Sequence, residues 1–133
     1  MPKLIKKLLE PNTLLVICLL YVLLITIAFL FPARVGVKIN FIIPLDKIIH
    51  SSIYLILAFL WNCYFYLTKN KDAIKKSVFT ILGLCLTYGI IIEILQEQFV
   101  QYRGADIFDV LANMIGAMVG TIIFLNVKNR INS

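Results

Sequence analysis

The chain has 133 residues, of which 61% are apolar and only 15% are charged, and its mean hydropathy is +0.93. About half of the residues in a soluble domain are apolar, so this composition argues against a soluble domain and predicts a polytopic helical membrane protein of one domain, residues 1–133. The formal net charge of +6 does not indicate nucleic-acid binding, because the basic residues flank apolar runs, where they set topology and meet anionic lipid headgroups.

The first apolar run, residues 14–31, contains no charged residue. A bilayer-spanning helix needs about 20 residues and tolerates about 17, so this run predicts the first transmembrane helix. A short basic head, residues 1–12, precedes it, with Thr13 in position to cap the helix, and Pro32 is expected to end it.

The second span is predicted over residues 48–67, with Asp46 placed as its N-cap. Trp61, Tyr64 and Tyr66 crowd the far end of this span, as is typical of an aromatic belt at a membrane interface. The second span therefore has recognisable signals at both of its ends.

Two further apolar runs predict spans over residues 78–95 and 107–127. The fold class that follows is all-α, a bundle of four transmembrane helices in a multi-pass protein of the cell membrane. An even number of spans places both termini on one side of the membrane.

The basic residues indicate which side that is. The side with both termini would hold Lys3, Lys6, Lys7, Lys69, Lys71, Lys75, Lys76, Lys128 and Arg130. The opposite side would hold only Arg34, Lys38, Lys47 and Arg103. The positive-inside rule therefore predicts that both termini are cytoplasmic.

This topology brings polar residues from three spans to one depth, the outer boundary of the bilayer. They are Asp46, His50, Glu93, Gln96, Arg103, Asp106, Asp109 and Asn113. Ionisable groups at membrane depth are costly and indicate function by default, so these residues form the candidate site.

Spacing predicts how the helices of this site face one another. Asp106, Asp109, Asn113, Gly116 and Gly120 are three or four residues apart and share one helical stripe. Glycines at this spacing let another helix approach closely, so the stripe should face protein rather than lipid.

Gly89, Glu93 and Gln96 repeat this pattern on the third span, and we expect the two faces to meet, with Gln96 bonding Asn113 or a carboxylate. A polar clasp between helices is the alternative explanation. Polar contacts between membrane helices are worth about 0.6 kcal/mol on average, whereas an acid at mid-span costs about 2.5–3.5 kcal/mol and less near the interface. This comparison favours function for the cluster.

The second span adds an imidazole, because Asp46, His50 and Tyr54 follow one another at intervals of four residues. Either the carboxylate orients the ring, or Asp46 only caps the helix and His50 only reaches the headgroups. Together the residues suit a divalent cation or acid–base work on a lipid-linked substrate, with Lys47 and Arg103 able to hold a phosphate. The sequence contains no familiar metal-binding motif that would decide between cation binding and acid–base work.

These same residues give the chain a resemblance to the VanZ-like family of small bacterial membrane proteins. The matching pieces are residues 46–50 with Tyr54, Gly89 with residues 93–96, and residues 103–109 followed by Asn113, Gly116 and Gly120. An aromatic residue expected after the histidine is Ser51 here.

The resemblance implies a multi-pass protein of the bacterial envelope in a family whose name-giving member is associated with teicoplanin resistance. The resulting hypothesis is an outward-facing polar pocket that binds or processes a lipid-linked or phosphate-bearing envelope component. One alternative is a non-enzymatic membrane interaction or scaffold protein whose polar stripe only clasps helices. Ion or proton transport is weaker, because the inner halves of the spans offer no acidic relay.

Overall fold

The computed structural model describes residues 2–31, 45–101 and 104–131, and these residues form helices joined by short connections. The elements are α1 (Lys3–Leu8), α2 (Pro11–Leu30), α3 (Leu45–Thr68), the 3-10 turn η1 (Lys71–Ala73), α4 (Ile74–Phe99) and α5 (Ile107–Ile131). Four of these helices, α2 to α5, are long and apolar enough to cross a membrane. The predicted all-α bundle of four membrane helices is therefore confirmed.

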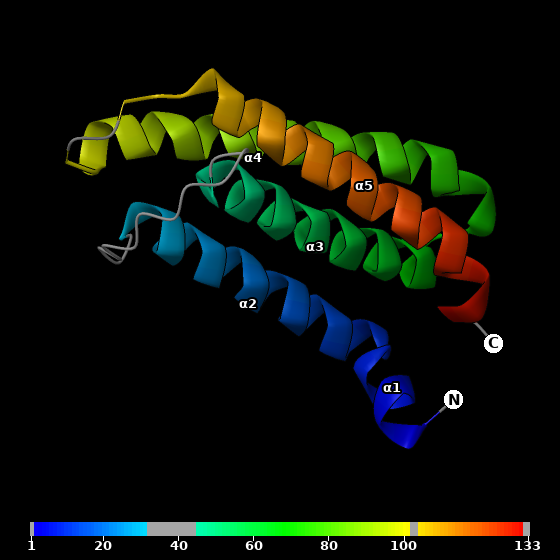
Figure 1. Ribbon diagram of the computed structural model, residues 1–133. Coiled ribbons are helices and arrows are strands. Elements are labelled where there is room, and N and C mark those ends of the chain that lie inside the picture. The colour runs from blue at the N-terminus through cyan, green and yellow to red at the C-terminus, as the bar shows by residue number, and fades with distance from the viewer. Residues whose placement is uncertain (1, 32–44, 102–103, 132–133) are drawn as a thin grey trace.

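The four long helices run back and forth, so α2 begins and α5 finishes at the same end of the bundle (Figure 1). We call this the terminal end, and the opposite end, where α3 and α5 begin and α4 finishes, the site end. The prediction that the terminal end is cytoplasmic rests on the charge pattern alone.

Each span is longer than predicted, mainly because polar residues at the ends continue the helices. In α2 the N-cap position is Glu10 and Pro11 opens the helix, where a missing N–H costs nothing, so the prediction of Thr13 as the cap is wrong. Asp46 likewise lies in the first turn of α3 rather than before it, where a carboxylate still complements the helix dipole. Pro32, the predicted end of the first span, lies outside the described residues.

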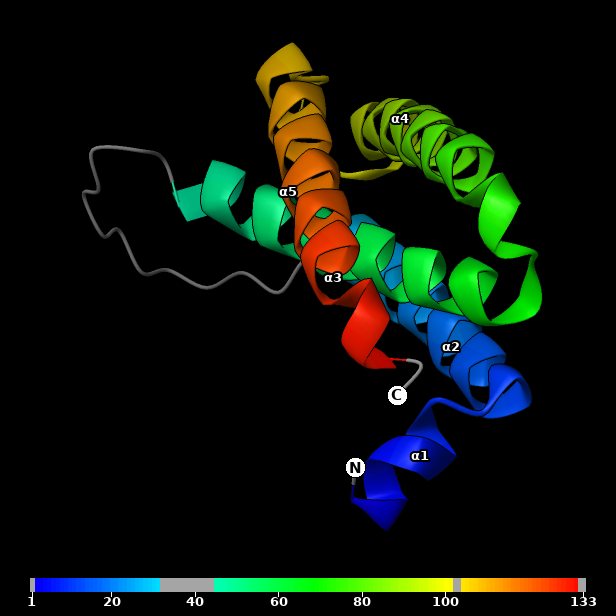
Figure 2. The same ribbon diagram turned by 90° about the vertical axis from the view of Figure 1, so that its right-hand side faces the viewer.

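The bundle is built around α3, which contacts α2, α4 and α5, and its most extensive contact is with α5. Figure 2 shows α5 crossing directly over α3. A Cβ on Gly116 would lie 1.9 Å from the Ser51 carbonyl oxygen, and one on Gly120 would lie 2.1 Å from that of Leu55. Both glycines therefore permit close packing, as predicted, but against α3 rather than against α4.

The distribution of side chains is that of a protein surrounded by lipid. Large apolar residues such as Leu24, Phe79 and Ile107 are well exposed. The buried polar residues are His50, Asn62, Glu93, Gln96, Asp109, Asn113 and Thr121. Polar groups gather inside because hydrocarbon offers them no hydrogen bonds.

We expect Gly116→Ala to lower the thermal unfolding temperature in detergent, because the new methyl group must push α5 away from α3. Overpacking typically costs about 1–3 kcal/mol. Gly83→Ala is the matched control, since nothing lies within 4 Å of its Cβ position and alanine favours helix by about 0.5–1 kcal/mol. Equal unfolding temperatures for the two variants would contradict the close α3–α5 contact.

Candidate functional site

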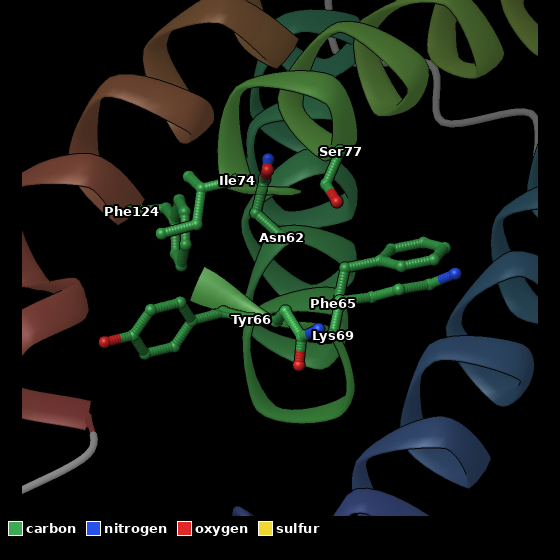
Figure 3. A pocket seen from close by; sticks show the side chains of 8 residues that line it. Asn62, Phe65, Tyr66, Lys69, Ile74, Ser77 and Phe124 are labelled. Carbon is green, nitrogen blue, oxygen red and sulfur yellow. The ribbon is translucent and has the colours of Figure 1, made fainter. Parts of the chain in front are cut away.

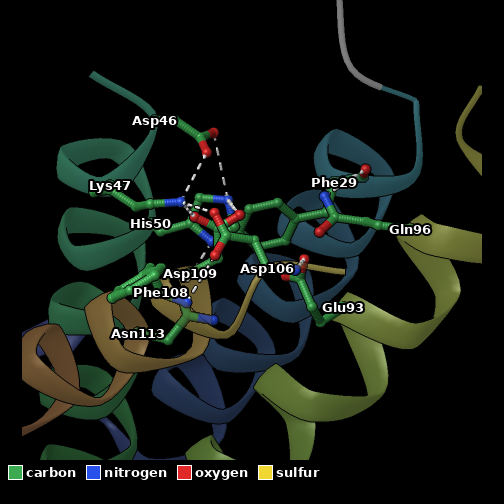
Figure 4. Close-up of polar contacts among 10 residues, drawn as sticks. All are labelled: Phe29, Asp46, Lys47, His50, Glu93, Gln96, Asp106, Phe108, Asp109 and Asn113. Atoms are coloured by element: carbon green, nitrogen blue, oxygen red, sulfur yellow. Dashed lines mark hydrogen bonds and ion pairs between the residues drawn. The ribbon is translucent and has the colours of Figure 1, made fainter. Parts of the chain in front are cut away.

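An ion cluster joins α3 to α5 at the site end. The Lys47 ammonium donates hydrogen bonds to Asp106 Oδ2 and Asp109 Oδ1, and it lies 3.6 Å from Asp46 Oδ2 (Figure 4). The Asp109 side chain is 2% exposed, whereas those of Asp46 and Asp106 are 48% and 40% exposed. We call Asp46, Lys47, Asp106 and Asp109 the Lys47 cluster; one buried and two accessible carboxylates surround its single ammonium.

His50 lies directly beneath this cluster and is almost fully buried. Its Nδ1 is 3.1 Å from Asn113 Oδ1, and its Nε2 is 3.7 Å from Asp46 Oδ1 and 3.8 Å from Asp109 Oδ2. The ring also packs on Phe29 of α2, with the ring centroids 4.8 Å apart. Three helices therefore fix the imidazole in one orientation.

The contact with Asn113 determines what the other ring nitrogen can do. An amide oxygen only accepts, so Nδ1 is the donor in this hydrogen bond, and Nε2 is directed toward two carboxylates. In the imidazolium form the ring forms ion pairs with these carboxylates through Nε2, and in the neutral form the Nε2 lone pair is available as a base or a metal ligand. The arrangement therefore suits proton transfer or cation binding.

Asp46, His50 and Asp109 are also the residues that can hold a metal ion, since their ligand atoms lie within 4.8 Å of one another. Two ligands at about 2.1 Å from one metal are at most about 4.2 Å apart. Both His50–carboxylate distances fall within that limit, but the 4.8 Å span of the three ligand atoms is wider, so the side chains would have to draw together around an ion. Asn113, bonded to the other ring nitrogen, supplies the supporting contact usual for a metal-bound histidine. The nearby Lys47 ammonium would have to move aside, because like charges repel.

α4 supports the site from the other side. Glu93 is buried, and its Oε1 accepts a hydrogen bond of 2.8 Å from the Asp106 backbone N–H. Asp106 in turn accepts from the Phe108 N–H and so caps the start of α5. Glu93 therefore holds the segment that carries Asp106 in place.

Gln96 makes a different hydrogen bond from the one that the sequence predicts. Its Nε2 donates to the carbonyl of Phe29, 3.1 Å away, in the last turn of α2, so the prediction that it bonds Asn113 or a carboxylate is wrong. Carbonyls in the last turn of a helix have no partner within the helix, which makes them strong acceptors in an apolar setting. Gln96 therefore ties α2 to α4 and keeps Phe29 on His50.

The structure brings most of the predicted site residues together. Those in contact within or around the Lys47 cluster are Asp46, His50, Glu93, Asp106, Asp109 and Asn113. Arg103 lies outside the described residues. Gly89 lies where predicted, with its Cβ position 3.1 Å from Asn113 Nδ2, so α4 meets α5 at this depth.

Lys47 and Phe29 are site residues that the sequence pattern does not single out. The pattern indicates Lys47 only as a possible phosphate ligand, yet within the described residues it is a cation that three carboxylates share. Its position one residue after Asp46, in a span start that also carries His50, was the available signal. Phe29 has no such signal, because nothing distinguishes it from other apolar residues of the first span.

A groove adjoins the Lys47 cluster on the lipid-facing side of the α3–α5 contact. Its volume is about 270 Å³, and its lining comprises Lys47, Ile48, Ser51, Ser52, Ala112 and Ile115. Ile48 and Ile115 are exposed, so the groove opens toward the surroundings of the bundle. Lys47 thus belongs both to the ion cluster and to a groove with apolar sides.

Comparison with known proteins gives one family. The model of the VanZ/LLP1 family matches residues 13–128, which cover α3 and α4 completely and most of α2 and α5. Neither the curated proteins nor the solved structures compared with this chain include a match.

A double-mutant cycle in detergent should separate the buried ion pair from the exposed one. For Lys47→Met with Asp109→Asn we expect a coupling of about 1–3 kcal/mol in the free energy of unfolding, the upper part of the range for contacting residues. For Lys47→Met with Asp46→Asn we expect less than about 1 kcal/mol, because water screens the Asp46 carboxylate. Equal couplings would refute the central position of Asp109.

Proposed function

The chain belongs to the VanZ/LLP1 family, and from this premise we propose that it is a multi-pass protein of a bacterial cell membrane that binds or processes a lipid-linked or phosphate-bearing envelope component. One observation carries the proposal: Lys47 lies at the junction of a polar cluster and an apolar-sided groove. A ligand with an anionic head and a hydrocarbon tail needs this combination.

The tail of such a ligand fits the groove between α3 and α5. Ile48, Ala112 and Ile115 give it apolar contact, and the open side lets a chain enter from the bilayer. Ser51 also lines the groove, and its hydroxyl makes no side-chain hydrogen bond within the described residues, so it can donate to a phosphate near Lys47.

The head of the ligand has to compete for the Lys47 ammonium. Of the two carboxylates that accept hydrogen bonds from Lys47, Asp106 is the more easily displaced, because it is 40% exposed and lies just before α5, whereas Asp109 is buried. Among the described residues the cluster holds three carboxylates and one ammonium, and a phosphate that arrives with a divalent cation would also be accommodated, the cation going to Asp46, His50 and Asp109. When no cation is bound, Nε2 of His50 is instead the group that exchanges a proton with the bound head.

We propose further that an envelope component held at this site is the means by which the protein affects sensitivity to glycopeptides such as teicoplanin. The competing proposal is a scaffold in which the site only clasps helices. Lys47–Asp109 and His50–Asn113 do join α3 to α5, which is what a clasp requires. The groove beside Lys47 favours ligand binding, since a clasp has no use for it.

A long-chain isoprenoid phosphate should raise the thermal unfolding temperature of the purified wild type in the presence of Mg²⁺, since a ligand that binds only the folded state stabilises it. The isoprenoid alcohol of equal length, which lacks the charge, should raise it less. We expect Lys47→Met to abolish the difference between the two ligands and Lys3→Met on α1 to retain it. If wild type responds equally to phosphate and alcohol, the proposed binding mode is wrong.

The proposal requires the site end to face outward. We expect a cysteine at Gln101 to react with a membrane-impermeant maleimide in intact cells, and one at Asp72 to react only after the cells are opened. Both positions are exposed in connections between helices, whereas the native Cys18, Cys63 and Cys85 are buried. The reverse labelling pattern would place the site on the cytoplasmic side and exclude the outward orientation.

A further inference from the structure

A second groove, separate from the Lys47 cluster, lies between α2, α3 and α4 in the terminal half of the bundle. Its volume is about 250 Å³, and its lining is almost wholly apolar. The residues that shape it include Val22, Leu57, Trp61, Phe65, Leu84 and Cys85. Leu84 is 59% exposed, so this groove also opens toward the bilayer.

Phe65 connects this groove to the basic residue Lys69 at the terminal end of the bundle. It lines the groove, and the Lys69 ammonium lies 5.8 Å from the centroid of its ring. Figure 3 shows Phe65 and Lys69 together with other residues of this end. The exposed Lys69 ammonium therefore lies beside a ring that lines the groove, at the end of the bundle where the membrane surface is expected.

A smaller cavity, which Phe65 and Lys69 also line, is not the ligand site. Asn62 and Ser77 belong to its lining as well (Figure 3). Its volume is about 10 Å³, which is room for about one water molecule and not for a headgroup. The space for a ligand lies in the groove.

We propose that the groove between α2, α3 and α4 binds one acyl chain of an anionic phospholipid, with the lipid phosphate held by Lys69. Charge complementarity identifies this occupant. Lys69 is followed by Lys71, Lys75 and Lys76, against Asp72 as the single acid of residues 69–76. A zwitterionic lipid would gain the same apolar contact from the groove but less from this charge.

Trp61 supplies a direct test, because it is the single tryptophan of the chain and lines the groove. The protein is reconstituted into phosphatidylcholine vesicles that contain a fixed fraction of brominated phosphatidylglycerol or of brominated phosphatidylcholine. Bromine on an acyl chain quenches tryptophan on contact. We expect brominated phosphatidylglycerol to bind about fivefold more strongly at Trp61, the effect of one basic residue near an anionic head.

Lys69→Gln should reduce this preference to near one while quenching by both lipids persists, because the groove remains. Lys3→Gln on α1 is the matched control for loss of surface charge and should keep the preference. Leu84→Phe should lower quenching by both lipids, since the ring fills the groove.

The proposal is overturned if wild type shows no preference or if Lys69→Gln retains it. Equal loss of the preference in Lys3→Gln would also overturn it, because it would show a general effect of surface charge. Unchanged quenching in Leu84→Phe would remove the groove from the account.

Discussion

The close approach of α3 and α5 is the constraint on which the site depends. With no side chains on Gly116 and Gly120, the α5 backbone rests against the Ser51 and Leu55 carbonyls. One to two turns farther toward the site end, the same pair of helices brings Lys47 to Asp109 and His50 to Asn113. A wider separation would leave a lysine, a histidine and several acids without partners in an apolar medium, at a cost of several kcal/mol.

α2 and α4 complete the candidate site that α3 and α5 form between them. Gln96 bonds the last turn of α2, and this contact keeps Phe29 on the outer face of the His50 ring. Glu93 bonds the backbone at Asp106, which fixes the chain just before α5. Glu93 and Gln96 of α4 thus each position a residue of another segment, and the candidate site is formed by four helices.

The sequence was sufficient for the fold class and for the gathering of polar residues at one end of the bundle, because both follow from where charge interrupts apolar runs. Asp109 and Asn113 share a face by helical spacing alone, and both contact His50. Helical spacing does not determine which neighbouring helix a given face packs against. The sequence predicts that Gly116 and Gly120 pack against the third span, but they pack against the second. Glycine permits close packing with any neighbouring helix and does not determine which one. The hydrogen bond from Gln96 to the Phe29 carbonyl also could not be predicted from spacing, because it depends on how the helices are arranged in three dimensions.

The most direct test of the central claim is native mass spectrometry with phosphorus and metal analysis of the protein purified in mild detergent. Wild type, Lys47→Met and Lys69→Gln are compared in parallel. The account predicts that wild type retains a lipid-linked, phosphorus-bearing molecule that Lys69→Gln keeps and Lys47→Met loses, while all three proteins remain folded. If wild type and Lys47→Met are equally folded and carry the same bound molecules, or none, the Lys47 cluster is a clasp between helices and not a binding site.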